Sequence, residues 1–247
     1  MKLAPKVIFL VKDSEGFASA ISGALRPNPP FTVTTLDECF EFSLEDYAIK
    51  DQKASGSIVH YLDDKGIFQV SVLILQSYEP PVLACALDVV LSHIAGERSA
   101  SSSKAKPTLV VPSAITSSNL KWESKTVTKN DWTGLLYGTK IGPETDISRS
   151  MGAKVKKLPS TSQIYYEQLA CLYHLIQILN IPAFFVVGRT TGRSLSNQAA
   201  GEEIQILSEM GELLADSLPI SFSREGIVWN PKETSKDIKE PWRALYG

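Results

Sequence analysis

A helix-patterned hydrophobic segment that runs almost directly into a hydrophobic strand restricts this chain to layered folds in which helices cover a sheet. Residues 164–179 place hydrophobic side chains on one wide face at helical spacing, which predicts a helix of about five turns. That face consists of Ile164, Leu169, Cys171, Leu172, Leu175, Ile176, Ile178 and Leu179. Pro182 prevents the helix from continuing, and the uninterrupted hydrophobic residues 183–187 predict a buried strand.

The start of the chain predicts a strand, a helix and a second strand. Residues 7–11 are a continuous hydrophobic run of strand length, and Ser14 is a suitable N-cap for a helix that ends near Leu25. Prolines stop that helix, and residues 31–35 have the aromatic and β-branched composition of a strand.

A hairpin and another helix are predicted next. Residues 58–62 and 67–75 are strand-like and flank the turn-forming residues 63–66, so we expect them to pair in antiparallel fashion. Hydrophobic residues recur at helical spacing over residues 82–94, and Gly96 is a plausible C-cap. An antiparallel hairpin beside strand-helix units predicts a mixed sheet.

The segment between the two halves of the chain has a weaker pattern. Residues 108–111 predict a buried strand that Pro112 closes. Periodicity is poor over residues 116–162, which we expect to be an irregular insert. Within it, hydrophobic residues could supply one short strand or helix: Trp122, Trp132, Leu135, Leu136 and Tyr137.

The last elements complete the predicted domain. A helix is expected over residues 197–214, and residues 219–222 are expected to return to the sheet. The inner face of that helix is predicted to carry Ile204, Leu207 and Leu214. The element order predicts one three-layer α/β domain over residues 1–229, with a mixed, mostly parallel sheet and helices on both faces. Residues 230–247 are charged and weakly hydrophobic, which predicts a flexible C-terminal arm.

Composition argues against several classes of protein. The net charge of -2 and a densest basic run confined to residues 154–157 argue against general nucleic-acid binding. No stretch reaches the roughly 18 to 20 hydrophobic residues of a membrane span. Cys39, Cys85 and Cys171 lack the spacing of a zinc site, so we expect reduced thiols, no metal and no cofactor. The expected location is the cytosol, with the nucleus as a second compartment.

Catalytic motifs are weak throughout the sequence. The Gly-rich residues 188–194 superficially resemble a phosphate loop, but the glycine spacing is too short and Arg193 stands where a P-loop has lysine. His60, His93 and His174 have no spacing that suggests a metal site or a catalytic triad. We therefore expect no enzyme.

The C-terminus has the chemistry of a ligand. The chain ends with Leu245, Tyr246 and Gly247, which are a hydrophobic residue, a tyrosine and a residue that carries a free α-carboxylate. Capture of a C-terminal carboxylate is a recurrent recognition mode. Such an ending arises by chance in roughly one chain in a hundred, and many termini have no function. The tripeptide therefore needs support from the rest of the sequence.

That support comes from a resemblance. Residues 156–159, the helix over 164–179 and the Ile-Pro-Ala-Phe-Phe segment at 181–185 resemble the core of the eukaryotic proteasome assembly chaperone 1 family, in which a hydrophobic-Tyr-X tripeptide closes the chain. The resemblance implies a three-layer α/β chaperone without catalysis. It also implies a heterodimer with proteasome assembly chaperone 2, which holds 20S proteasome α-subunits during α-ring assembly. Leu245, Tyr246 and Gly247 would then dock in a pocket between α-subunits.

Two alternatives stay open. A small-molecule hydrolase or phosphorylase-like enzyme predicts a polar ligand pocket at the strand ends, near residues 188–194 and 111–115. An adaptor of another kind predicts protein partners that include no proteasome subunits.

Overall fold

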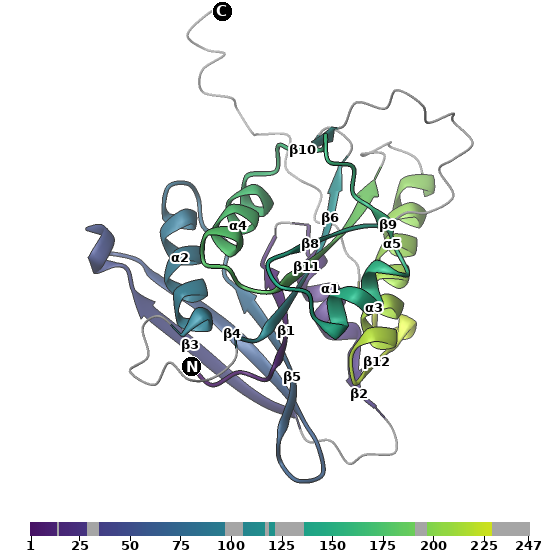
Figure 1. Ribbon diagram of the computed structural model, residues 1–247, viewed down its shortest axis with the longest axis horizontal. Coiled ribbons are helices and arrows are strands. Elements are labelled where there is room, and N and C mark those ends of the chain that lie inside the picture. The colour runs from purple at the N-terminus through teal and green to yellow at the C-terminus, as the bar shows by residue number, and fades with distance from the viewer. Residues whose placement is uncertain are drawn as a thin grey trace, which may run out of the picture.

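The computed structural model describes residues 1–13, 15–28, 35–96, 106–116, 119–121, 136–190 and 197–228 (Figure 1). Its strands are β1 (Lys6–Val11), β2 (Leu25–Pro27), β3 (Thr35–Ser43), β4 (Lys53–Leu62), β5 (Phe68–Leu75), β6 (Thr108–Thr116), β7 (Leu120–Lys121), β8 (Leu136–Ile141), β9 (Lys156–Lys157), β10 (Gln163–Ile164), β11 (Ala183–Thr190) and β12 (Ile220–Phe222). Its helices are α1 (Phe17–Ala24), α2 (Val82–Ala95), α3 (Asp146–Gly152), α4 (Glu167–Ile178) and α5 (Asn197–Ser217).

One large sheet organises the chain, in the order β3-β4-β5-β1-β6-β11-β8-β9. The strands β5, β1, β6 and β11 run parallel to one another at its centre. Antiparallel pairs join β3 to β4, β4 to β5 and β8 to β11. The predicted mixed, mostly parallel sheet is therefore confirmed.

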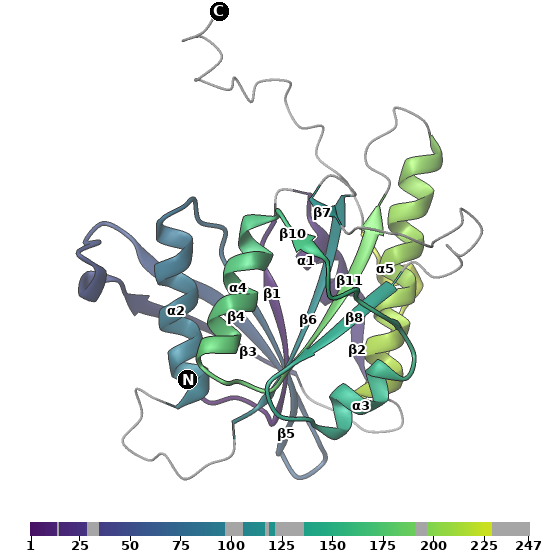
Figure 2. The same cartoon turned by 45° about the horizontal axis from the view of Figure 1, so that its top comes forward.

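Helices cover both faces of this sheet, as predicted. Side chains of β1 alternate, because successive residues of a strand point to opposite faces. Phe9 packs in the core that α2 and α4 cover, whereas Ile8 packs in the core that includes α1, α3 and α5. Figure 2 shows α2 and α4 side by side, with α5 at the opposite side of the fold beside β8 and β11. The three-layer α/β prediction is confirmed.

Several predicted elements are present with small changes of length. Strands β4 and β5 form the expected antiparallel hairpin. Helix α2 ends at the expected Gly96, whose φ of 79° lies in the left-handed region that favours glycine. Helix α4 leads into β11 through Asn180, with φ of 47°, and Ile181, which is fully buried.

The N-terminal predictions need correction. Helix α1 begins at Phe17 rather than near Ser14, which lies outside the described residues, and the carboxylate of Asp13 accepts hydrogen bonds from its first two N–H groups. Most of the strand predicted over residues 31–35 also lies outside the described residues. Strand β3 begins at Thr35 and continues to Ser43. This segment contains several acidic residues, and its composition did not predict a strand.

Pro112 does not end its strand. The pairing of β6 with β1 stops at Val110, whereas its pairing with β11 continues to Thr116. A proline, which lacks an N–H donor, is thus accommodated where β6 has separated from β1. This separation matters for the candidate site.

The predictions for the later helices and the last strand are wrong in detail. Residues 163–164 pair with β7 as strand β10 instead of starting α4, and Ile178 at the end of α4 is 76% exposed. In α5, Leu207 and Leu214 are buried as predicted, but Ile204 is 43% exposed. Strand β12 pairs with β2 in a small separate sheet rather than with the main sheet.

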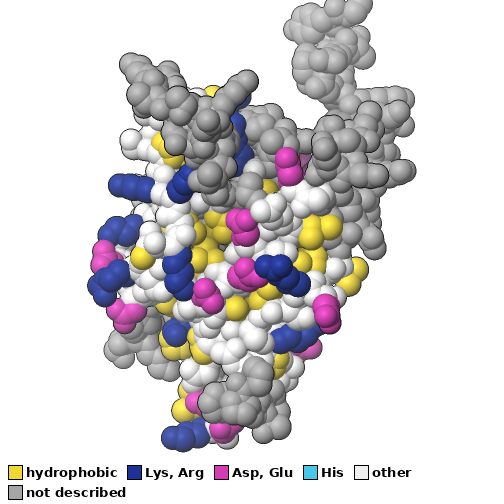
Figure 3. Space-filling view, turned by 90° about the vertical axis from the view of Figure 1, so that its right-hand side faces the viewer, with side chains coloured by type: hydrophobic (Ala, Val, Ile, Leu, Met, Phe, Trp, Pro, Cys, Tyr) yellow, Lys and Arg dark blue, Asp and Glu magenta, His cyan; other side chains and the backbone are white. Residues whose placement is uncertain are grey.

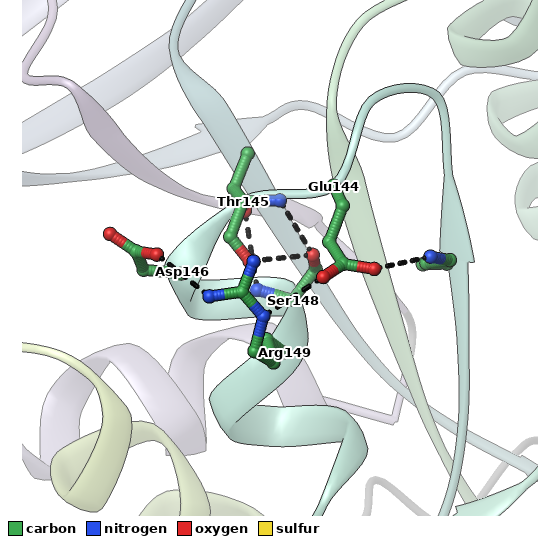
Figure 4. Close-up of polar contacts among 6 residues, drawn as sticks. Glu144, Thr145, Asp146, Ser148 and Arg149 are labelled. Atoms are coloured by element: carbon green, nitrogen blue, oxygen red, sulfur yellow. Dashed lines mark hydrogen bonds and ion pairs between the residues drawn. The ribbon is translucent and has the colours of Figure 1, made fainter.

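The segment predicted to be irregular contributes regular elements. Strand β8, which includes Leu136 and Tyr137, pairs with β11 in the main sheet, and β9 follows α3. Trp122, Trp132 and Leu135 lie outside the described residues. A capping box starts α3, because Thr145 Oγ1 accepts from the Ser148 N–H and Ser148 Oγ accepts from the Thr145 N–H (Figure 4).

Candidate functional site

The described part of the chain contains a pocket where the strand order of the sheet reverses. After β1 the chain builds β3, β4 and β5 on one side of that strand, and it returns through α2 to place β6 on the other side. Ligand crevices of α/β proteins form at such switch points, beyond the carboxyl ends of the strands. In Figure 2 the carboxyl ends of β1 and β6 lie at the end of the sheet where β7 and β10 are drawn.

This β1–β6 pocket has a volume of about 140 Å³. Its floor comes from the carboxyl ends of β1 and β6, and its walls come from the turn before α1, Asn119 and the first part of α4. The lining residues are Phe9, Leu10, Val11, Asp13, Glu15, Phe17, Val111, Pro112, Ser113, Ala114, Ile115, Thr116, Asn119, Tyr166, Gln168, Leu169 and Leu172. The pocket is smaller than the roughly 300 to 1,000 Å³ that is usual for drug-sized ligands.

The N–H groups at the start of α1 are already occupied. Asp13 Oδ1 accepts from the N–H of Phe17 at 3.0 Å, and Oδ2 accepts from the N–H of Ala18 at 2.9 Å. A helix N-terminus of this kind can bind a phosphate or carboxylate ligand. Here a carboxylate of the chain itself fills that role.

Two carboxylates line the pocket. They belong to Asp13 and Glu15, and the described part of the lining includes no Lys, Arg or His. Burial, together with the charges of these two carboxylates, raises the pKa of Tyr166 to about 12. Its hydroxyl therefore stays protonated at neutral pH and donates to Gln168 Oε1 at 2.6 Å.

The phosphate-loop candidate at residues 188–194 is only partly described, and the described part is not a loop. Residues 188–190 continue β11 and pair with β6. Gly188 packs directly against Ile206 of α5, where a Cβ atom would overlap that side chain. The glycine thus serves close packing of a helix on a strand. Residues 191–194 lie outside the described residues.

The three histidines lie on three different elements. His60 is fully buried in β4, His93 of α2 stacks on Phe42, and His174 of α4 is exposed. Among the described residues, no three His, Cys, Asp or Glu side chains are grouped as a metal site. None of the helices in the described ranges is long and apolar enough to cross a membrane.

The face formed by α3, α5 and β12 carries both signs of charge. Lys154 pairs with Asp216 at 3.6 Å, and Arg224 pairs with Glu212. Figure 3 shows Lys and Arg interspersed with Asp and Glu on this side of the molecule. A surface that binds duplex nucleic acid has Lys and Arg side chains clustered on one face instead.

The predicted site residues Leu245, Tyr246 and Gly247 lie outside the described residues. Sequence reasoning placed residues 111–115 at a possible ligand pocket, and they do line the β1–β6 pocket. It missed Asp13, Glu15 and Tyr166. The switch-point rule could have found the first two, because they follow the first strand directly.

A family model described as Domain of unknown function (DUF7894) matches residues 1–247. No curated protein matches the sequence. Among solved structures, Pyrococcus furiosus PbaB, an archaeal proteasome activator, is 10% identical, with a TM-score of 0.49 and coverage of 100% of this chain and 96% of that chain. Pyrococcus furiosus PbaA, an archaeal homolog of proteasome-assembly chaperone, is 11% identical, with a TM-score of 0.47 and coverage of 100% and 89%.

An MTA/SAH nucleosidase is also similar, at 10% identity and a TM-score of 0.41, with coverage of 88% of this chain and 95% of that chain. At such low sequence identity, neither a chaperone activity nor an enzyme activity can be transferred from these structures to this chain.

Proposed function

This chain belongs to the DUF7894 family, and we propose that it is a non-enzymatic chaperone of 20S proteasome assembly. In this proposal it promotes α-ring formation as a heterodimer with proteasome assembly chaperone 2, in the cytosol and also in the nucleus. Its last three residues dock between two α-subunits.

The observation that carries the proposal is the conjunction of a folded segment and a terminal sequence. Helix α4 leads into β11 through a short buried connection, in which Ile181 is fully buried and its N–H donates to the carbonyl of Ile176 at 3.1 Å. This is the helix-strand segment whose sequence resembles proteasome assembly chaperone 1. The same chain ends with Leu245, Tyr246 and Gly247, as that family does.

Each of the last three residues has a role in the proposed docking. The α-carboxylate of Gly247 pairs with a lysine of the α-ring pocket. The Tyr246 ring packs in that pocket while its hydroxyl makes a hydrogen bond, and Leu245 fills the apolar mouth. A C-terminal carboxylate held in this way fixes the register of the peptide.

A tripeptide is too small to bind tightly alone. A second contact through the folded domain raises its effective concentration, provided that the connecting arm reaches the pocket. A flexible chain of the length of residues 230–243 has an end-to-end distance of roughly 20 Å. The body and the tail therefore act as two tethered binding sites.

Capture of purified 20S α-subunits by the full-length chain tests the tail. We expect deletion of residues 245–247, and the change Tyr246→Ala, each to weaken capture about tenfold, as for a buried aromatic anchor. Tyr246→Phe removes the hydroxyl and keeps the ring, so it measures the contribution of the hydrogen bond alone. A single glycine added after Gly247 displaces the carboxylate without altering any side chain. Binding of the partner chaperone is the control and should not change. Unaltered α-subunit capture by the deletion and by Tyr246→Ala would rule out tail docking.

One observation supports the alternative of a hydrolase or phosphorylase-like enzyme, and another argues against it. A pocket does lie at residues 111–115, as that alternative predicts. However, Asp13 occupies the first two N–H groups of α1, and among the residues that the structure describes neither Lys nor Arg lines the pocket to stabilise a phosphate or an oxyanion. A thermal shift of the purified protein with phosphorylated metabolites or esters would restore the alternative.

A further inference from the structure

We propose that Cys85 of α2 and Cys171 of α4 are a redox-active pair, which closes into a disulfide and fixes the two helices to each other. The oxidant in this proposal is a low-molecular-weight disulfide such as glutathione disulfide. The inference goes beyond the proposed chaperone function and does not depend on the C-terminal residues.

The two cysteines lie on neighbouring helices. Helices α2 and α4 pack against each other, and Cα atoms of one approach those of the other within 8 Å. Helix α2 leads into β6 and α4 leads into β11, and these strands are adjacent and parallel, so the two helices run in the same direction. Both helices begin at the upper side of the fold in Figure 2. Cys85 is the fourth residue of α2 and Cys171 is the fifth residue of α4, so both cysteines belong to the same end of the helix pair.

Both thiols are reduced and partly buried, and both pack against the same hydrophobic core. In α4 the side chain of Cys171 lies beside the buried face, which is made of Leu169, Leu172 and Ile176. Leu169 and Leu172 also line the β1–β6 pocket. A covalent link at Cys171 would therefore fix one wall of that pocket.

The electrostatic surroundings of Cys171 include groups of α2. Burial raises the pKa of the Cys171 thiol, and the negative charges of the Cys85 thiolate and of Asp88 raise it further. Cys85 and Asp88 both belong to α2, and a charge shifts a pKa from a neighbouring position. Cys171 thus lies at the side of α4 that faces α2, in the neighbourhood of Cys85.

The spacing of packed helices suits a disulfide. Their axes are usually about 8 to 10 Å apart, and each Cα atom lies about 2.3 Å from its axis. Cα atoms that face each other across such a pair are therefore about 3.5 to 5.5 Å apart. A disulfide joins Cα atoms about 4.4 to 6.8 Å apart, so neighbouring cysteines on two such helices can be linked with little movement of the backbone.

The raised pKa of Cys171 assigns the order of the two steps, because the thiolate is the nucleophile in disulfide exchange. The thiolate of Cys85 attacks one sulfur of glutathione disulfide, the S–S bond of that compound breaks, and one glutathione leaves and takes up the proton that Cys85 has lost. The Cys171 thiol then loses its proton, and its sulfur attacks the sulfur of Cys85. The second glutathione leaves and takes up this proton. The two protein thiols are oxidised by two electrons in total, and the small disulfide is reduced to two thiols.

Closure of the pair has two consequences. A cross-link between distant parts of the chain stabilises a fold by restricting the unfolded state. Disulfides of proteins in reducing compartments are mostly transient and redox-sensing. In a cytosolic protein, as proposed above, the pair would therefore respond to the oxidation state of its surroundings.

Cys39 provides an internal control. It is exposed on β3, and its neighbour Phe40 packs in the core that α2 covers. Successive residues of a strand point to opposite faces, so the sheet separates Cys39 from the two cysteines of the pair. The single changes Cys39→Ser, Cys85→Ser and Cys171→Ser each leave two thiols, but only the first leaves the neighbouring pair.

Mass spectrometry of the full-length variants tests the pair after reaction with glutathione disulfide and alkylation of the remaining thiols in denaturant. We expect Cys39→Ser to lose two hydrogen atoms within a single chain, to retain no glutathione and to have no thiol left to alkylate. Peptide mapping should join the peptides that contain Cys85 and Cys171, and dithiothreitol should restore both thiols. The variants Cys85→Ser and Cys171→Ser should instead retain glutathione on Cys39 and form no disulfide within the chain.

The fixing of the helices is tested by urea denaturation of Cys39→Ser, whose oxidised form should unfold at a higher urea concentration than its reduced form. Glutathione retained on Cys39→Ser would overturn the pair, and so would two free thiols in this variant under conditions that modify Cys39 in the other two. Equal yields of disulfide within the chain from all three variants would also overturn it, because the link would then not depend on the packing of α2 on α4. An oxidised form that unfolds at the same or a lower urea concentration would overturn the fixing of the helices.

Discussion

The Oδ1 atom of Asp13 lies 3.0 Å from the backbone nitrogen of Phe17, the first residue of α1. The N-cap residue itself is Gly16, which has φ of 85° and no side chain to satisfy the helix N–H groups. Asp13 supplies that cap from three residues earlier in the chain, with its second oxygen bound to the N–H of Ala18. The same carboxylate lines the β1–β6 pocket, so it links the stability of α1 to the charge of the candidate site.

The change Asp13→Ala should destabilise the protein by about 1 kcal/mol, within the range of 0.5 to 2 kcal/mol observed for lost helix caps. The cause is the loss of both acceptors for the first N–H groups of α1. Urea denaturation measures the change in the free energy of unfolding. Asp64→Ala is the matched control, since Asp64 is exposed in the turn between β4 and β5. Equal free energies for the two variants would contradict the capping role.

A second prediction concerns His60 and low pH. The His60 side chain is fully buried, its Nδ1 lies 2.8 Å from Ser71 Oγ, and its Nε2 lies 3.6 Å from Glu38 Oε2 without a hydrogen-bond partner. Burial lowers the pKa of His60 below its ordinary value of 6.5, although Glu38 acts in the opposite direction. Burial dominates because the imidazole is completely enclosed while Glu38 is half-exposed.

At low pH the unfolded chain therefore binds a proton at His60 more readily than the folded protein does. Stability should fall as the pH drops below about 6.5, by at most about 1.4 kcal/mol per pH unit from this group. Denaturation curves measured from about one pH unit above that ordinary pKa to about one and a half units below it give the slope. We expect a smaller slope for His60→Gln and an unchanged slope for His174→Gln, at an exposed residue. An undiminished slope in His60→Gln would assign the pH dependence to other groups.

A third prediction concerns the buried Tyr61 and the partly buried Tyr166 at high pH. Burial raises the pKa of Tyr61 and of Tyr166 to about 12. Between pH 10 and pH 12 the folded protein keeps both phenol protons, whereas the unfolded chain has lost them. The free energy of unfolding is therefore unaffected by these two groups below pH 10 and falls as the pH rises towards 12. Titration followed by tyrosinate absorbance should lose one late-ionising group in Tyr166→Phe. The control Tyr165→Phe, at a tyrosine that is 54% exposed, should retain that group.

The parts of the fold that the sequence predicted are those in which one local pattern decides the structure. The hydrophobic face of α4, the β4–β5 hairpin and the Gly96 cap all follow from spacing within a single segment. Strand β3 was missed because its first five residues are exposed at the edge of the sheet. Polar and charged side chains stand there, so the alternating hydrophobic pattern that predicts a strand is absent. The continuation of β6 through Pro112 depends on its neighbours, β1 and β11, which no local pattern reveals.

The candidate pocket was predictable only in part, for the same reason. Residues 111–115 follow a recognisable strand, and α/β folds place ligands near such positions. Tyr166 reaches the pocket from a segment far away in the sequence, and its place depends on how α4 packs over the sheet. Three-dimensional proximity, and not residue type, brings Asp13, Glu15 and Tyr166 together.

The last prediction concerns the packing of Gly188 against Ile206. A Cβ atom on Gly188 would overlap Ile206 Cγ2 and would lie 3.4 Å from Met210 Cε, so Gly188→Ala should cost about 1 to 3 kcal/mol. Gly201→Ala in α5 is the control, because open space surrounds Gly201, and alanine there should stabilise the helix by up to about 1 kcal/mol. Ile206→Ala removes the obstructing atoms and should be less harmful in the Gly188→Ala background than in the wild type, with a coupling of at least about 1 kcal/mol in urea denaturation. Additive effects of the two changes would show that β11 and α5 do not contact each other at these residues. The hypothesis that Gly188 belongs to a phosphate-binding loop would then be open again.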